Sequence, residues 1–312
     1  MLYAIAAIVV GVGVLAWAAD QFVLGASRVA LIRNVSPLVV GVVIIGFGTS
    51  APELIVSAIA SAGDEPEVAI GNIVGSNIAN LSLLLGVGAL IVPLVVVSRT
   101  VKREAPLVVG AVILFAVVVQ GGGISRVEGV LLLLAMAVSL FVVSRQSSAD
   151  PLDGDVVELA DPAGHRFGRE VGRTLVGLLG TIGAAQLLLW GALDLAERAE
   201  LSEGFVGATM VAVGTSLPEL VTVVQSARRR ETDLIVGNLL GSNLFNALGV
   251  GGVVGLIGAP SIDNAALTTV AALAAVVVAA GALLVMMTSH TVTRREGFVL
   301  IAAYAIIVPF LA

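Results

Sequence analysis

The chain has 312 residues, of which 58% are hydrophobic and 12% charged, and its mean hydropathy is +1.08. In a soluble domain about a quarter of the residues are charged, so this composition excludes an ordinary soluble globular protein. The absence of cysteine excludes a disulfide framework and any thiolate metal or nucleophile site, while the net charge of −6 does not by itself indicate a partner.

Apolar runs long enough to cross a membrane recur along almost the whole chain. They predict ten spans, at about 2–20 (extending as far as Arg28 on the longest reading), 38–62, 67–96, 104–121, 127–144, 171–195, 204–227, 233–258, 265–288 and 296–312. Runs rich in Ala, Gly, Val and Leu suit close helix packing in lipid, whereas barrel strands would be shorter and would alternate polar with apolar residues. The sequence therefore predicts an all-α polytopic membrane protein.

The first span resembles a signal peptide in one respect, the small residues around Ala16-Trp17-Ala18. No positive charge precedes its apolar stretch, as a signal peptide requires. We therefore expect this span to remain in the mature protein.

The basic residues predict the orientation. Fourteen of the sixteen fall in loops after the odd-numbered spans: Arg28, Arg33, Arg99, Lys102, Arg103, Arg145, Arg166, Arg169, Arg173, Arg228, Arg229, Arg230, Arg294 and Arg295. Only Arg126 and Arg198 follow even-numbered spans. Because positive loops favour the cytoplasm, we expect both termini outside the cell membrane and the central loop inside.

Two segments repeat one another at a fixed offset of 166 residues. Gly46–Asn80 and Val213–Asn246 both contain the patterns GTS-x-PE and GN-x-x-GSN-x-x-N. The same offset aligns span 1 with span 6, span 2 with span 7 and span 3 with span 8. Five spans per half is an odd number, so the halves enter the membrane with opposite orientation, as in many secondary transporters. The predicted units are 1–144, an acidic cytoplasmic linker at 145–169, and the inverted half at 170–312.

Polar groups interrupt the second span of each half. Pro52 and Pro218 each remove a helical hydrogen bond, and freed carbonyls inside a bilayer are tolerated only in buried or wet surroundings. Thr49 lies four residues before Glu53, so the two share one helix face. The same spacing relates Thr215 to Glu219, Ser76 to Asn80 and Ser242 to Asn246.

These groups are hard oxygen donors, which suit sodium and calcium better than soft metals. The proline kinks alone are often structural, and the Gly71-x-x-x-Gly75 and Gly237-x-x-x-Gly241 pairs are interpreted as packing contacts. A carboxylate in mid-membrane is costly and indicates function. Its duplication predicts a cation site between the two halves.

The doubled GTS-x-PE and GN-x-x-GSN-x-x-N segments resemble the two alpha repeats of the calcium/cation antiporter superfamily, and specifically its prokaryotic sodium/calcium exchangers. The resemblance covers essentially the whole chain. It implies electrogenic exchange of several sodium ions for one calcium ion by alternating access, through four adjacent cation sites, and it implies neither enzymatic activity nor a cofactor. The expected partners are these inorganic cations and the lipid bilayer, with no nucleic acid and no protein partner.

The resemblance also implies roles for individual residues. Glu53 and Glu219 would bind calcium and also contact sodium, with the main-chain carbonyls of Thr49 and Thr215 completing the calcium shell. The flanking sodium sites would use Ser50, Ser76, Ser216 and Ser242 with the carbonyls of Gly46 and Ala212. Asn80 and Asn246 would line the central position.

Some relatives in the superfamily carry an aspartate where Asn246 stands, so potassium co-transport is less expected here. The acids of the linker do not fit the spacing of an EF-hand. A proton/calcium antiporter stays open as an alternative, and a cation channel is a more distant one, because sites so rich in charge would bind too tightly for fast passage. For an intramembrane hydrolase, no recognition element for lipid or peptide is visible.

Overall fold

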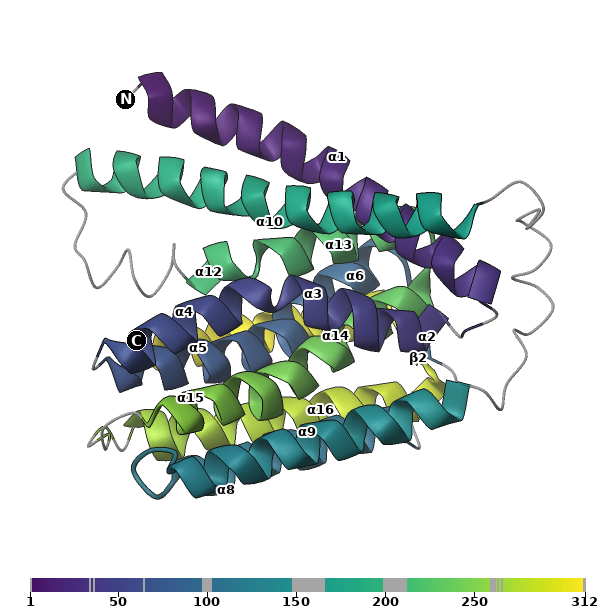
Figure 1. Cartoon of the computed structure of the whole chain (residues 1–312). Coiled ribbons are helices and arrows are strands. Elements are labelled where there is room, and N and C mark those ends of the chain that lie inside the picture. The colour runs from purple at the N-terminus through teal and green to yellow at the C-terminus, as the bar shows by residue number, and fades with distance from the viewer. Residues whose placement is uncertain are drawn as a thin grey trace.

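The computed structural model describes residues 2–33, 35, 37–63, 65–96, 103–147, 166–198, 212–258, 262, 264 and 266–310. Helices make up nearly all of it (Figure 1). In chain order the main elements are α1 (Leu2–Arg33), α2 (Pro37–Val40), η1 (Gly41–Gly46), α3 (Phe47–Thr49), α4 (Ala51–Ala62), α5 (Pro66–Ala79), η2 (Asn80–Leu84), α6 (Leu85–Ile91), β1 (Leu94–Val95), α8 (Glu104–Val119), α9 (Arg126–Ser147), α10 (Phe167–Arg198), α12 (Ala212–Thr215), α13 (Leu217–Arg228), α14 (Thr232–Leu244), η6 (Phe245–Val250), α15 (Gly251–Ile257), η7 (Ala266–Ala271), α16 (Ala272–Ser289), β2 (Thr291–Val292), α17 (Arg294–Ile307) and η8 (Val308–Phe310).

The apolar helices confirm a multi-pass membrane protein. Within the described ranges, six helices are long and apolar enough to cross a bilayer, and the bent pair Gly41–Thr49 with Ala51–Ala62 makes a seventh. The helix Glu104–Val119 is apolar but shorter. The predicted count of ten spans stays a prediction.

Several predicted boundaries differ from the structure. The first and sixth spans are longer than predicted, since α1 and α10 have 32 residues each. Helix α9 extends into the start of the predicted linker, and α10 begins before its end. The centre of the linker lies outside the described residues, and so do Asp64 and 199–211. A 32-residue helix is roughly 48 Å long, against a hydrocarbon core of about 30 Å, so both helices must tilt or protrude.

The third predicted span, 67–96, is wrong at its end. The helix stops at Ile91, and Val92 is extended because it precedes Pro93, which cannot continue a helix. Leu94 and Val95 then pair antiparallel with Val292 and Thr291. This short sheet joins the segment after α6 to the segment between α16 and α17.

Helices α1 and α10 lie side by side along one flank of the molecule (Figure 1). Glycines bring them close: a Cβ on Gly177 would lie 2.6 Å from the Cα of Phe22, and one on Gly25 would lie 2.8 Å from the main-chain nitrogen of Thr174. Helices α8, α9 and α16 form the opposite flank, and the interrupted helices α4, α5, α13 and α14 lie between the flanks.

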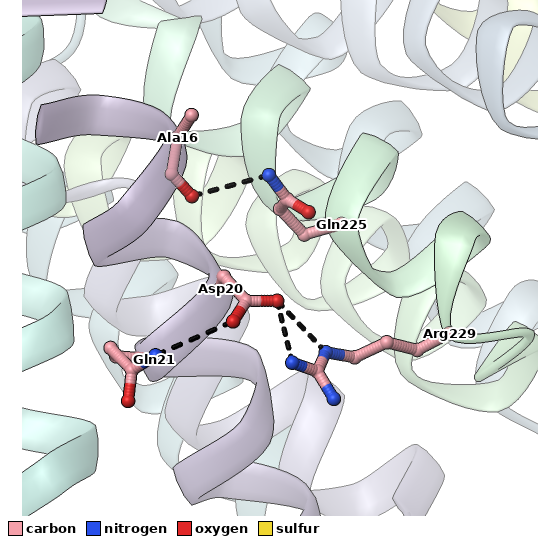
Figure 2. A network of polar contacts seen from close by, with 5 residues as sticks. All are labelled: Ala16, Asp20, Gln21, Gln225 and Arg229. Carbon is pink, nitrogen blue, oxygen red and sulfur yellow. Dashed lines mark hydrogen bonds and ion pairs between the residues drawn. The ribbon is translucent and has the colours of Figure 1, made fainter. Parts of the chain in front are cut away.

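Polar contacts connect α1 to the interrupted helix α13 (Figure 2). The guanidinium of Arg229 donates to Oδ1 of Asp20 through Nη2 at 2.6 Å and Nε at 3.1 Å. One helical turn away, Nε2 of Gln225 donates to the carbonyl of Ala16 at 3.2 Å. Both contacts join residues that are 209 positions apart. Side chains of the second half, at the end of α13, therefore hold α1 against the central helices.

Candidate cation-binding site

Each half of the chain contains a helix that breaks at the same repeat position. Ser50 separates α3 from α4 with φ −82° and ψ 8°, and Ser216 separates α12 from α13 with φ −88° and ψ 8°. Pro52 and Pro218 lie in the first turn of the new helix, where a missing N–H costs little. The predicted interruption is confirmed, and its location is two residues before each proline.

The breaks place both glutamates at helix N-termini. Glu53 is the third residue of α4, and Glu219 is the third residue of α13. Main-chain N–H groups in a first turn have no helical acceptor and carry partial positive charge. The local fold thus favours a carboxylate at these two positions, although both are buried.

The two carboxylates are bonded crosswise by the opposite halves. Ser50 Oγ donates to Oε1 of Glu219 at 3.1 Å, and Ser216 Oγ donates to Oε1 of Glu53 at 3.4 Å. In each case the serine of one half donates to the glutamate of the other half, so the two hydrogen bonds are equivalent under the repeat. The structure brings these four predicted residues into one cluster.

The second oxygen of each carboxylate has no partner in the described part of the chain. Oε2 of Glu53 and Oε2 of Glu219 are buried without a hydrogen bond, and the residues are 1% and 0% exposed. A buried carboxylate without a countercharge is strongly destabilising. The free oxygens therefore suit a cation held between the two halves.

A hydroxyl pair lies beside this centre on one side. Ser242 Oγ donates to the carbonyl of Gly46 at 3.2 Å and lies 3.5 Å from Oγ1 of Thr49. All three were predicted as ligands, and they are adjacent. On the other side Thr215 is buried, and Ala212 begins α12.

Asn80 and Asn246 are buried in widened helices. Asn80 begins the π-helical segment η2, and Asn246 is the second residue of η6. Their side-chain oxygens and nitrogens are buried, and none has a hydrogen-bond partner within the described ranges. Single π-helical turns often occur at functional sites, so these amides are available to a ligand.

Not every predicted residue is joined to the cluster. Ser76 is buried on α5, but no hydrogen bond links it to the other candidates in the part of the chain described. Conversely, two residues of the repeated GN pair received no role from sequence reasoning: Asn72 and Asn238 each contact a candidate threonine. Their recurrence at the offset of 166 was the available signal.

The packing interpretation of the glycine pairs is confirmed for the second half. A Cβ on Gly41 would lie 3.0 Å from the Cα of Gly237, and one on Gly241 would overlap the carbonyl oxygen of Val42. Among the described residues nothing lies within 4 Å of the equivalent position on Gly75. The position that the repeat aligns with Gly41 is 207, which lies outside the described ranges.

Comparison with known proteins identifies the family. The model of the sodium/calcium exchanger protein family matches twice, at residues 3–145 and 170–312. The chain belongs to the sodium/calcium exchanger family. This family member is a multi-pass membrane protein, and the resemblance drawn from the repeated motifs is confirmed.

Individual relatives agree with this membership. The putative antiporter CaxA of Alkalimonas amylolytica is 38% identical over 85% of this chain and 84% of its own length. The sodium/calcium exchanger MaX1 of Methanosarcina acetivorans is 28% identical, with 80% of this chain and 81% of that protein covered.

A solved structure agrees as well. The sodium-calcium exchanger NCX_Mj, soaked with Na⁺ and Sr²⁺, superposes with a TM-score of 0.87 at 30% identity and covers 99% of this chain and 98% of that one. These relatives are named as exchangers and antiporters rather than enzymes, which is consistent with the expected absence of enzymatic activity.

Proposed function

We propose that this family member exchanges sodium for calcium across the cell membrane by alternating access. The observation that carries the proposal is the crosswise carboxylate pair, in which each glutamate keeps one buried oxygen free. Two negative charges balance one calcium ion, and hard oxygen ligands suit calcium and sodium. No catalytic group and no cofactor enters the proposal.

The ligand roles follow the positions of the residues. Glu53 and Glu219 bind calcium, helped by the main-chain carbonyls of Thr49 and Thr215. Asn80 and Asn246 line the centre. The sodium sites on either side use the following residues: Ser50, Ser76, Ser216, Ser242, and the carbonyls of Gly46 and Ala212.

The proposed architecture has ten spans in two inverted halves, 1–144 and 170–312, joined by the cytoplasmic linker 145–169. Both termini face outward. The charge of the loops supports this orientation, because fourteen of sixteen basic residues lie on one side of the ten-span arrangement. The family model matches the chain twice, once in each proposed half, which supports the division into two halves.

Exchange of three sodium ions for one calcium ion would be electrogenic. With two ionised glutamates, calcium leaves the site neutral, while three sodium ions leave one positive charge. An inside-positive potential should therefore accelerate calcium entry that is coupled to sodium exit.

The deciding experiment is uptake of labelled calcium into proteoliposomes, with sodium, potassium and proton gradients imposed separately. We expect saturable uptake that needs internal sodium and responds to a potential clamped with potassium and valinomycin. Uptake driven equally by a proton gradient without sodium would favour the proton/calcium alternative. Uptake without any counter-ion would favour a channel, and uptake independent of potential would refute the electrogenic ratio.

A further inference from the structure

Asn72 on α5 and Asn238 on α14 share one contact, in which the amide oxygen meets a threonine of the opposite half. Oδ1 of Asn238 lies 3.3 Å from Oγ1 of Thr49, a hydroxyl that also lies 3.0 Å from the carbonyl of Ile45. Nδ2 of Asn238 donates to Oγ1 of Thr222 at 3.1 Å. Oδ1 of Asn72 accepts from Oγ1 of Thr215 at 3.5 Å. Each amide oxygen thus contacts the candidate threonine of the other half.

The amide nitrogens reach the glutamate helices of their own halves. Nδ2 of Asn72 donates to Oγ of Ser57 at 2.9 Å and to the main-chain carbonyl of Glu53 at 3.2 Å. Thr222, the partner of Asn238, follows Glu219 by three residues, and its hydroxyl lies 2.8 Å from the carbonyl of Glu219. Each asparagine therefore connects one glutamate helix to the threonine of the opposite half.

Neighbouring asparagines on the same helices behave differently. Nδ2 of Asn77 donates to the carbonyl of Ile73 at 2.8 Å, and Nδ2 of Asn243 donates to the carbonyl of Leu239 at 2.7 Å. These bonds stay within one helix, four residues back. The cross-helix contacts are thus a property of the Asn72 and Asn238 positions and not of every asparagine in these spans.

We propose that Asn72 and Asn238 are positioning residues of the cation site. Both ends of each amide are occupied by protein partners, so these side chains act through Thr49, Thr215 and the main chain at Glu53 and do not bind the ion. An amide has its acceptor and donors fixed in one plane, so a single rotamer sets the distance between the glutamate of one half and the threonine of the other. This inference rests on the proposed function of the site.

A positioning role and a purely structural role of these asparagines predict different effects of their removal. Loss of a packing residue reduces the amount of folded protein and its maximum rate, whereas loss of a positioning residue weakens cation binding by protein that is still folded. Removal of one hydrogen bond within a site changes an equilibrium constant by about five- to tenfold. We expect a rise of that size in the half-saturating calcium concentration.

The test uses Asn72→Ala and Asn238→Ala in the full-length protein, with Asn77→Ala and Asn243→Ala as matched controls. Calcium counter-flow gives the half-saturating concentration and the maximum rate per folded protein. We expect the concentration to rise about five- to tenfold in the first pair and to stay unchanged in the controls. An unchanged concentration in the first pair, or an equal rise in the controls, would overturn the inference.

A milder variant covers the case in which the alanine variants do not fold. Thr222→Val keeps the side-chain shape but removes the partner of Asn238, and it should reproduce part of the effect. Where Asn238→Ala does fold, combining it with Thr222→Val should add little, because both changes break one connection. Full additivity of the two changes would refute this connection.

A binding measurement separates this inference from the proposed function. The unfolding temperature of the solubilised protein is measured with NaCl, KCl, CaCl2 and MgCl2. If the wild type does not transport calcium but is stabilised by one of these salts, the proposed function fails, and the concentration dependence of that shift then tests the asparagines. No stabilisation by any of them would refute both.

Discussion

At the scale of single residues, the proposed cation site depends on its two buried glutamates. Each is bonded on one oxygen by a serine of the other half, and each starts a helix whose first turn favours negative charge. These features stabilise the ionised form without neutralising it. In the proposed site, the bound cation would balance these charges.

Glu53→Gln or Glu219→Gln should lower calcium transport about 100-fold or more. Two opposite unit charges about 4 Å apart attract each other by about 4 kcal/mol at an effective dielectric of about 20. Loss of one carboxylate charge would cost a divalent ion more binding energy than that. Labelled-calcium uptake measures the effect, with Glu67→Gln, an exposed residue on α5, as the control. Near wild-type flux in either variant would show that its carboxylate is not a ligand.

Asn246→Asp should make transport more sensitive to acid. The amide supplies an oxygen without a charge, whereas a carboxylate in the same buried position binds a proton in competition with the cation. Uptake measured from pH 6 to 8 should fall more steeply toward low pH in the variant than in the wild type. Parallel pH profiles would place position 246 outside the ion pathway.

At the scale of elements, the site depends on helices that are interrupted where they meet. The breaks at Ser50 and Ser216 and the widened turns η2 and η6 expose polar main chain in the centre of the molecule. Close glycine contacts between η1 and α14 bring the halves together on one side. The prolines in the sequence indicated the breaks near Ser50 and Ser216, but π-helical turns have no comparable sequence signal.

Gly241→Ala should destabilise the protein by about 1–3 kcal/mol, as overpacking of a tight contact does. The added Cβ would meet the main chain of Val42, which cannot move as a flexible side chain would. Gly110→Ala is the matched control, because Gly110 is exposed and no described residue lies within 4 Å of its Cβ position.

Thermal unfolding in detergent should show a lower midpoint for Gly241→Ala. The control should be neutral or slightly stabilised, since alanine is the better helix former. Equal midpoints for the two variants would contradict the packing interpretation.

At the scale of the whole molecule, the inverted repeat predicts opposite sides for equivalent loops. A Glu65→Cys variant, whose cysteine lies between α4 and α5, should react with an impermeant thiol reagent from outside. Cysteine at Arg228 should react only from the cytoplasm. Both residues are exposed, and the chain has no native cysteine to interfere.

A membrane-permeant reagent should label both positions and serves as the control for accessibility. Arg228 is preferred to Arg229 because the latter is paired with Asp20. Labelling of both cysteines by the impermeant reagent from one side would refute the inverted topology.

The sequence alone determined the class of protein, the repeat and most of the candidate ligands. Composition and apolar runs depend only on transfer between water and lipid, and a duplicated polar motif inside apolar runs is visible without any contact. Glu53, Glu219 and their serines and threonines could be chosen on that basis. The family could be recognised from the same residues.

Only the tertiary structure decided which partners these residues have. Three kinds of contact join positions about 140 to 200 residues apart: Ser50 with Glu219, the contacts of Asn72 with Thr215 and of Asn238 with Thr49, and the strand pairing of Leu94 with Val292. Such contacts depend on how two halves pack, and no local pattern of hydropathy or spacing encodes their geometry. The sequence therefore supplied the chemical groups of the site, and the packing of the halves set which group meets which.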